Sequence, residues 1–186
     1  MRVVNEFWVP LRLQNNERSV GRALALCYDL AGSLVLVGIV LAAFMSFGVK
    51  PTMVDGVSME PALRDRQTLV IAAWPRRVRH GDIVVVADTG TSLGEPIVKR
   101  VIGLPGDKIN IDFQAGVVYR NGEALDEPYA AAPTDIRYDV VFPLEVPPGR
   151  CFLLGDNRAH SEDSRSSRVG LVDLREIEGV VIGKGK

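Results

Sequence analysis

The sequence predicts a mostly β domain, antiparallel and barrel-like or built on a coiled sheet, with one transmembrane helix at its N-terminal end. The segment from Leu30 to Val49 carries no charge over about 20 residues, which is the length of a membrane span. After Lys50 the chain changes to short runs rich in Val and Ile, bounded by Gly, Pro, Asn and Asp. No later stretch sustains the apolar period of a helix, so strands are expected from there on.

The apolar segment from Leu30 to Val49 is interpreted as a helix that crosses the membrane. At roughly 1.5 Å per residue it covers a hydrocarbon core about 30 Å thick. A removable secretory signal is one alternative, but its apolar core would span about 7 to 15 residues and end at a small-residue cleavage site. Phe44-Met45-Ser46-Phe47 does not supply such a site. A buried core helix is the other alternative, but Lys50-Pro51 ends the apolar run abruptly. The segment ahead of the run is polar and irregular.

Positive charge is concentrated ahead of the apolar segment. Only Lys50 follows it closely, whereas four arginines precede it, namely Arg2, Arg12, Arg18 and Arg22. The positive-inside rule therefore predicts a cytoplasmic arm over residues 1–29, a transmembrane helix over 30–49 and an extracytoplasmic domain over 50–186. Cys27 and Cys151 would then lie on opposite sides of the membrane, so they cannot form a disulfide within one chain.

Charge and histidine content exclude several functional classes. The 23 acidic and 22 basic residues nearly cancel, so no global positive field favours nucleic acid as a partner. His80 and His160 are the only histidines, and neither has a cysteine or second histidine at ligand spacing. We therefore expect no metal site and no cofactor, and both histidines are expected in surface loops.

The predicted strands occupy most of the region after the helix. Asn121-Gly122 predicts a hairpin turn after one of them, because both central residues of a type I′ turn need positive φ. Internal repeats are absent, and the Gly- and Pro-rich stretches are interpreted as loops within one domain. The strands are expected at Thr68 to Ala72, Ile83 to Val86, Ile97 to Ile102, Lys108 to Ile111, Val117 to Arg120, Tyr138 to Phe142, Cys151 to Leu154 and Val180 to Ile182.

The first segment with more special residues than a β fold needs is Gly56-Val57-Ser58-Met59-Glu60-Pro61. Ser58 lies between a flexible glycine and a proline that fixes the following turn. Two interpretations are open for it. Ser58 is a nucleophile, or it is an ordinary turn residue, since a G-x-S motif alone is not specific.

The second such segment is the strand around Lys99, whose neighbours are otherwise Ile and Val. Alternation places Lys99 and Arg100 on opposite faces, so one of the two basic side chains is expected to point inward. A lysine in an apolar site loses hydration of its ammonium form, which lowers its pKa and creates a neutral amine that can accept a proton. The alternative is a solvent-facing lysine that protects an edge strand from aggregation.

The third segment, from Gly155 to Arg165, is dense in hydrogen-bonding groups. Its two aspartates and two arginines can form buried or half-buried pairs, and its serine hydroxyls can orient an amine. A solvated polar loop is the alternative for this segment taken alone.

These segments together resemble the boxes of bacterial type I signal peptidases, which are Ser/Lys serine proteases. Four matches occur in the order of the family and cover nearly the whole exported domain. They are Gly56-x-Ser58-Met59-x-Pro61, Gly81-Asp82-Ile83-Val84-Val85, Val98-Lys99-Arg100-Val101-Ile102-Gly103-Leu104-Pro105-Gly106-Asp107, and Gly155-Asp156-Asn157-Arg158 with Ser161-x-Asp163-Ser164-Arg165.

The resemblance implies roles for individual residues. Ser58 would be the nucleophile and Lys99 its general base, while Ser161 would hold the Lys99 amine. Four charged residues would brace the site, namely Asp156, Asp163, Arg100 and Arg165. Small side chains at the minus three and minus one positions of a precursor would enter shallow apolar pockets, expected by position at Val54, Met59, Leu63 and Val98.

The resemblance also implies partners, which are the signal peptide region of secretory precursor proteins and the phospholipid bilayer. The chain would be a single-pass protein of the bacterial cytoplasmic membrane, removing N-terminal signal peptides on the outer side. One departure is Gly56, where some members carry a serine that helps the oxyanion hole. Oxyanion stabilisation would therefore rest on backbone N–H groups, above all that of Ser58.

Two other functional classes share some of these features. A self-cleaving Ser/Lys repressor would be cytoplasmic and carry a DNA-binding region, in place of which this chain has an apolar helix. A catalytically silent membrane-anchored module would not need both Ser58 and Lys99. If Lys99 were a structural cation, His160 beside Ser161 would be the next candidate base. The sequence of the arm from Met1 to Gly21 does not indicate a role for it.

Overall fold

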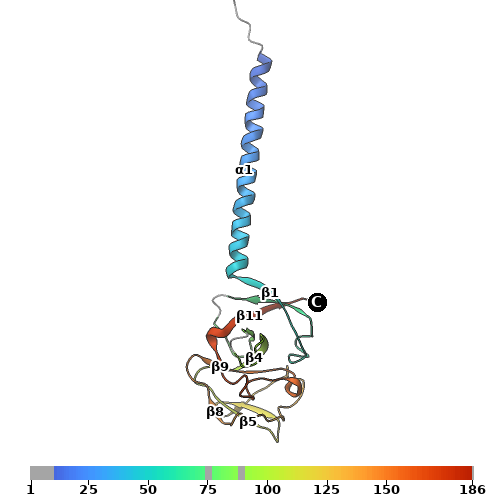
Figure 1. Cartoon of the computed structure of the whole chain (residues 1–186), viewed down its shortest axis with the longest axis vertical. Helices are drawn as coiled ribbons and strands as arrows, with labels where there is room; N and C mark the ends of the chain where they lie inside the picture. Colours follow the sequence, from blue (N-terminus) through green and yellow to red (C-terminus); the bar gives the residue numbers. More distant parts are fainter. Residues whose placement is uncertain (1–10, 74–76, 88–90, 186) are drawn as a thin grey trace, which may run out of the picture. The chain divides into compact units, whose positions relative to one another are not determined.

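The computed structural model describes residues 11–73, 77–87 and 91–185. The chain divides into two compact units, Met1–Met45 and Ser46–Lys186, which are described separately below. The first unit contains most of one helix, and the second contains all the strands (Figure 1).

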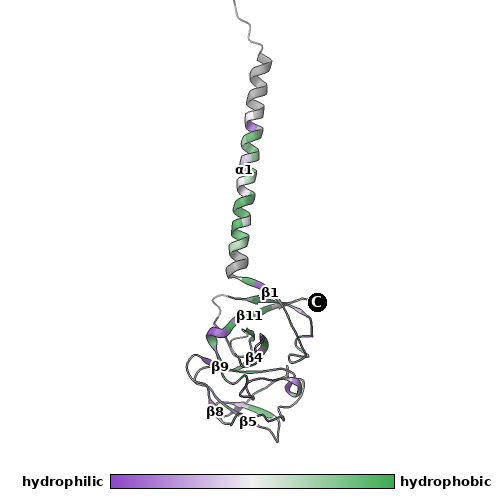
Figure 2. Ribbon diagram, in the orientation of Figure 1, coloured by the Kyte–Doolittle hydropathy of each residue, from purple (hydrophilic) through white to green (hydrophobic). Residues whose placement is uncertain are grey.

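Helix α1 extends over Leu11–Phe47. The part from Leu24 to Ala43 is long and apolar enough to cross a membrane, with a mean hydropathy of 2.2, and the hydrophobic colouring of this part is visible in Figure 2. The polar segment ahead of the predicted span is helical rather than irregular. The sequence offers a reason, because residues 11–20 contain no glycine or proline and include several good helix formers. The helix ends at Phe47, slightly before the predicted end at Val49.

The second unit contains two antiparallel sheets, which confirms the predicted mostly β fold. The larger sheet has seven strands in the order β1-β2-β11-β3-β4-β9-β10. Three of its pairings, β2 with β11, β3 with β11 and β4 with β9, shift register. Such bulges bend strands and increase their twist, which accounts for the curled sheet. Its strands are β1 Val49–Met53, β2 Thr68–Ala72, β3 Ile83–Val86, β4 Ile97–Gly103, β9 Arg150–Leu154, β10 Val172–Asp173 and β11 Ile177–Lys184.

The smaller sheet has four strands in the order β7-β6-β5-β8. These are β5 Lys108–Asp112, β6 Val117–Arg120, β7 Glu123–Ala124 and β8 Leu144–Glu145. The predicted turn at Asn121-Gly122 joins β6 to β7, and both residues have positive φ, 56° and 88°. The described residues also include two short 3-10 helices, η2 Arg158–His160 and η3 Leu174–Glu176.

Strand β4 lies at the centre of the domain because it borders three clusters of apolar side chains. Val101 is buried in the cluster under β3 and β9, and Ile102 in the cluster under β5 and β6. Val98 packs against a third cluster that includes Val54 and Met59, from the segment that follows β1. The apolar neighbours of β4 therefore hold it between the sheet core and the segment that carries Ser58.

The strand predicted at Tyr138 to Phe142 does not form. This segment is irregular because its hydrogen bonds go to the loop after β9 instead of to a neighbouring strand. The N–H of Val140 donates to the carbonyl of Arg165 over 3.1 Å, and the Tyr138 hydroxyl donates to the carbonyl of Ser161 over 3.2 Å. The apolar residue Phe142 packs edge-on against Phe152 rather than in a strand pattern, with ring centroids 5.7 Å apart.

We predict that Phe152→Ala destabilises the β domain by about 3 to 5 kcal/mol, because it removes a fully buried ring and leaves a cavity beside Phe142. The measurement is pulse proteolysis of the full chain in detergent micelles along a urea gradient. Val141→Ala is the matched control, since Val141 is 72% exposed and should leave the midpoint almost unchanged. Equal midpoints for Phe152→Ala and the native chain would contradict this description of the core.

Candidate functional site

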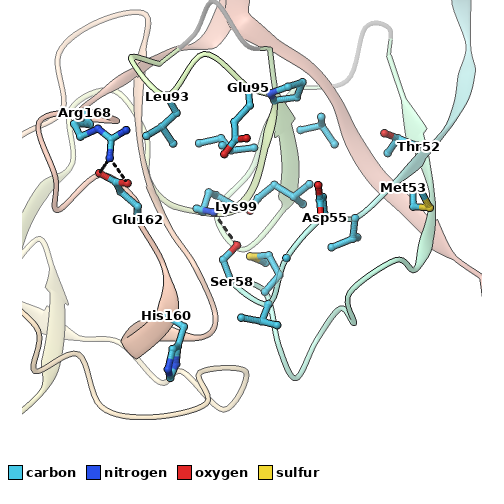
Figure 3. Close-up of a pocket in the computed structure, with 18 residues that line it drawn as sticks. Thr52, Met53, Asp55, Ser58, Leu93, Glu95, Lys99, His160, Glu162 and Arg168 are labelled. Carbon is cyan, nitrogen blue, oxygen red and sulfur yellow. Dashed lines mark hydrogen bonds and ion pairs between the residues drawn. The ribbon is translucent and has the colours of Figure 1, made fainter.

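Ser58 and Lys99 meet in the structure, although they are far apart in the sequence. The Nζ atom of Lys99 donates a hydrogen bond to Ser58 Oγ over 2.9 Å and contacts the Val98 carbonyl over 3.2 Å. Figure 3 shows this bond in the middle of a groove. Lys99 is the inward-facing basic residue of β4 and only 4% exposed, which excludes the solvent-facing alternative.

Burial sets the protonation of Lys99. Loss of hydration lowers the pKa of its amine, and this effect outweighs the opposing influence of nearby carboxylates, led by Asp163 and followed by Glu162 and Glu95. The neutral form of the amine is therefore more populated than in an exposed lysine. A neutral amine 2.9 Å from a hydroxyl has the position and the free electron pair that a general base needs.

The loop that carries Ser58 is fixed by hydrogen bonds from both sides. Gly56 has a φ of 92°, which suits glycine, and its N–H donates to Asp65 Oδ1 over 2.8 Å. Asn157 donates twice to the same loop, from its backbone N–H to the Ser58 carbonyl over 3.0 Å and from Nδ2 to the Val57 carbonyl over 3.2 Å. Among the residues that the structure describes, none accepts a hydrogen bond from the Ser58 N–H. That donor is available to a ligand in the groove.

Gly155 permits the close approach of three segments. A Cβ atom at this position would lie 2.6 Å from the Ser58 carbonyl oxygen and would also clash with the Ser161 side chain. A glycine is therefore required at the end of β9 for the loop of Ser58 and the loop of Ser161 to pack against it.

The segment after β9 takes part in two buried ion pairs. The first joins Asp156 to Arg100 of β4. Nε of Arg100 bonds Oδ1 over 2.7 Å and Nη2 bonds Oδ2 over 2.6 Å, so the pair is bidentate. The guanidinium also lies 4.1 Å from the ring centroid of Tyr129. Asp156 is fully buried, and such a paired geometry is what offsets the desolvation of its charge.

Asp163 and Arg165 form the second buried pair, with both side chains fully buried. Arg165 bonds both carboxylate oxygens, at 2.8 and 2.9 Å, and Ser161 Oγ donates to Oδ2 over 2.8 Å. The expected bond between Ser161 and the Lys99 amine is not present among the described contacts. The single hydroxyl proton of Ser161 is donated to the Asp163 carboxylate, and the Lys99 amine bonds Ser58 and the Val98 carbonyl instead. Ser161 therefore supports the site through Asp163 in this structure.

A third buried arginine, Arg158, anchors a loop that the sequence did not single out. Its side chain is 1% exposed and bonds both carboxylate oxygens of Glu127, at 3.0 and 2.7 Å. It also donates to the Gly155 carbonyl over 3.0 Å and to the hydroxyl of Thr134. Glu127 lies in a loop without a local pattern, so only the three-dimensional structure reveals its role. Asn157, by contrast, stands inside a motif that the sequence did identify.

The groove around Ser58 and Lys99 has a volume of about 620 Å³. Three of the four predicted pocket residues line it, namely Val54, Met59 and Val98. The fourth, Leu63, is buried in the same apolar cluster but is not among the lining residues. The full lining consists of residues 52–59, Val85, Leu93, residues 95–99, His160, Glu162 and Arg168.

His160 lies at the edge of this groove and is exposed. Its Nδ1 is 3.2 Å from the side-chain oxygen of Asn157, and no hydrogen bond joins it to Ser58 in the described part of the chain. Lys99 is therefore the better-placed base. Within residues 11–73, 77–87 and 91–185, no group of three or more His, Cys, Asp or Glu side chains is arranged to hold a metal ion.

Similarity to known proteins agrees with the four motifs. Residues 27–183 match the family described as signal peptidase, peptidase S26. Signal peptidase I of Bacillus licheniformis is 35% identical over 78% of this chain and 81% of its own length. Signal peptidase I U of Bacillus subtilis is 32% identical over 79% of this chain and 83% of its own length. A crystal structure of a signal peptidase I from Enterococcus faecalis gives a TM-score of 0.47 at 31% identity, over 57% of this chain and 98% of that one.

The family match extends across the apolar helix, both sheets and every segment that contributes to the groove. The identity to the Bacillus enzymes extends over most of both chains, so it is not confined to a short motif. This chain therefore belongs to the signal peptidase family, peptidase S26, and is a serine peptidase.

Proposed function

We propose that this enzyme removes N-terminal signal peptides from exported precursor proteins, with Ser58 as nucleophile and Lys99 as general base. The observation that carries the proposal is the 2.9 Å hydrogen bond from a buried lysine amine to a serine hydroxyl inside a groove. Family membership supports the substrate class, since the relatives are named signal peptidase I. The experiment that tests the proposal is cleavage of a secretory precursor by the purified full chain in detergent. The Ser58→Ala variant is the control and is expected to be inactive.

The proposed reaction has two stages. Neutral Lys99 takes the proton from Ser58 Oγ as the oxygen attacks the scissile carbonyl carbon, and the resulting ammonium returns the proton to the leaving amine. The signal peptide is then held as an ester on Ser58. Lys99 next deprotonates a water molecule, which attacks the ester and releases the free carboxylate. This sequence requires neither a histidine nor a metal ion.

The oxyanion of each tetrahedral intermediate is proposed to be stabilised by backbone donors. The Ser58 N–H supports this role because it has no acceptor among the described residues. One well-placed donor contributes about 3 to 4 kcal/mol in comparable sites. With glycine at position 56, no side-chain hydroxyl is available there, and the Gly56 N–H is already bonded to Asp65.

The groove supports a preference for small residues at the minus one and minus three positions. Val54 and Met59 are almost fully buried and Val98 is half-buried, so their packed side chains form a shallow apolar floor. A larger side chain would have to displace atoms of a packed cluster, which costs about 1 to 3 kcal/mol. We infer that Leu63 supports this floor from behind.

The helix is proposed to hold the enzyme at the membrane surface where its precursors emerge. Confinement to one surface raises the effective concentration of enzyme and substrate. The excess of arginines ahead of the apolar part of α1 supports a cytoplasmic N-terminus and a β domain outside the cell membrane.

We predict that kcat/KM rises with pH through the lowered pKa of Lys99 and levels off above it, because only the neutral amine accepts the Ser58 proton. Glu162→Gln should move the midpoint to lower pH, since the Glu162 charge raises this pKa and its loss also leaves Arg168 unpaired. The measurement is kcat/KM for a short precursor peptide across the pH range in which the native chain stays folded. A profile that falls with rising pH would exclude Lys99 as the base.

We predict that Lys99→Arg lowers kcat/KM as far as Lys99→Ala does, by at least about 10²-fold, because guanidinium stays protonated and cannot act as a base. Lys108→Arg is the matched control, as Lys108 is exposed on β5 and should tolerate the change. Retention of near-native activity by Lys99→Arg would show that Lys99 is a structural cation, and His160→Ala would then be the next variant to assay.

We predict that a cysteine at Glu123 reacts with a membrane-impermeant maleimide on intact cells, because β7 belongs to the domain placed outside. The background variant is Cys27→Ser, while the native Cys151 can stay because it is fully buried. A cysteine at Glu17, ahead of the apolar part of α1, should react only after the membrane is broken. The reverse pattern for the two positions would overturn the proposed orientation.

A further inference from the structure

Two carboxylates at the rim of the groove have no partner among the residues that the structure describes. Asp55 belongs to the lining segment of residues 52–59, and Glu95 belongs to the lining segment that leads into β4. Both side chains are exposed, and neither forms a hydrogen bond or ion pair with another described residue. Figure 3 shows Glu95 above the Ser58–Lys99 pair and Asp55 to the right of it.

The other charges of the groove do not neutralise this pair. Glu162 is bonded to Arg168 over 2.8 Å, so these two charges offset each other. Lys99 contributes no charge in the neutral form that the proposed function requires. The groove lining then contains three carboxylates and one arginine, a net charge of minus two, and His160 is its other titratable side chain.

The geometry of an extended peptide decides which substrate residue meets the rim. Successive side chains of a β-like segment point to opposite faces. If the residues at minus one and minus three enter the apolar floor at Val54, Met59 and Val98, the residue at minus two points out of the groove. A long basic side chain at that position would extend toward the rim, where Asp55 and Glu95 lie.

We propose that Asp55 and Glu95 make this enzyme select precursors with Lys or Arg at the minus two position and disfavour those with Asp or Glu there. This inference rests on the proposed function and adds a substrate feature to it. A basic side chain would replace counter-ions at the rim and keep its stem against the groove wall. An acidic side chain would meet like charge from both walls.

The expected discrimination is moderate because both carboxylates are exposed to water. Exposed ion pairs each change an equilibrium by a small factor, so two attractive contacts set against two repulsive ones predict about a three- to tenfold ratio of kcat/KM for Lys over Glu. Salt screens such contacts within a few ångströms at molar concentration, so the ratio should fall toward one in about 1 M salt. A neutral Gln at minus two should give an intermediate value.

The test uses three synthetic precursor peptides that differ only at minus two, with Lys, Gln or Glu between two alanines. Each is assayed with the full-length enzyme in non-ionic detergent, at a pH on the plateau of the Lys99 profile. That choice of pH matters because removing the Glu95 charge also lowers the pKa of Lys99. The double variant Asp55→Asn with Glu95→Gln should cleave the Lys and Glu peptides at rates within about twofold of each other.

Matched controls separate the rim charges from general effects. Glu123→Gln removes an exposed carboxylate on β7, outside the groove lining, and should keep the native ratio. The charge-reversal double variant, Asp55→Lys with Glu95→Lys, should reverse the preference and favour the Glu peptide. Circular dichroism of each variant in detergent shows whether its fold is retained.

The outcomes distinguish this inference from the function on which it rests. Cleavage of the Gln peptide by the native enzyme, and not by Ser58→Ala, supports the proposed function whatever the other two peptides do. Equal rates for the Lys and Glu peptides in low salt, together with cleavage of the Gln peptide, would overturn the selectivity alone. No cleavage of any of the three peptides would count against the proposed function and the inference together.

Discussion

The exclusion of water from the Lys99 amine is the constraint on which the rest of the site depends. A lysine in water is charged and cannot accept a proton from a serine, so the proposed role of Lys99 as a base requires a fold that disfavours the ammonium form. Strand β4 meets this requirement by placing Lys99 between buried apolar neighbours, with only 4% of the residue exposed. The same strand is held by three apolar clusters, so packing keeps the Lys99 amine both buried and close to Ser58.

This constraint also explains why the carboxylates of Asp163 and Glu162 are each paired with an arginine. Asp163 and Glu162 raise the pKa of Lys99, and an unpaired charge at either position would favour the ammonium form more strongly. Each is bonded to an arginine, Asp163 to Arg165 and Glu162 to Arg168. We infer that the arginines serve two purposes. They satisfy buried or half-buried carboxylates, and they limit the negative field at the amine.

Asn157 and Gly155 connect the loop after β9 to the loop that carries Ser58. Asn157 lies between the two buried ion pairs in the sequence and donates two hydrogen bonds to the loop of Ser58. Gly155 leaves room for that loop beside Ser161. A change in the loop after β9 is therefore expected to move Ser58, even though it does not alter Lys99.

Local pattern predicted those features that depend on neighbours in the sequence. The alternation of β4 predicted that one of Lys99 and Arg100 points inward, and the Asn121-Gly122 pair predicted its turn, because strand pleat and turn geometry are local properties. The segment from Tyr138 to Phe142 has the composition of a strand, but its hydrogen bonds go to a distant loop. Neither Glu127 as the partner of Arg158 nor Asp163 as the acceptor of Ser161 could be predicted, because such pairing depends on tertiary contacts.

The neutral state of Lys99 can be measured directly by nuclear magnetic resonance of the full chain in detergent, with carbon-13 at the lysine Cε atoms. The Lys99 signal is assigned as the one missing from the spectrum of Lys99→Arg. The predicted result is a titration midpoint below the ordinary range of a lysine side chain, coincident with the midpoint of the kcat/KM profile. A Lys99 signal that titrates in the ordinary lysine range would contradict the claim that burial prepares this amine to act as a base.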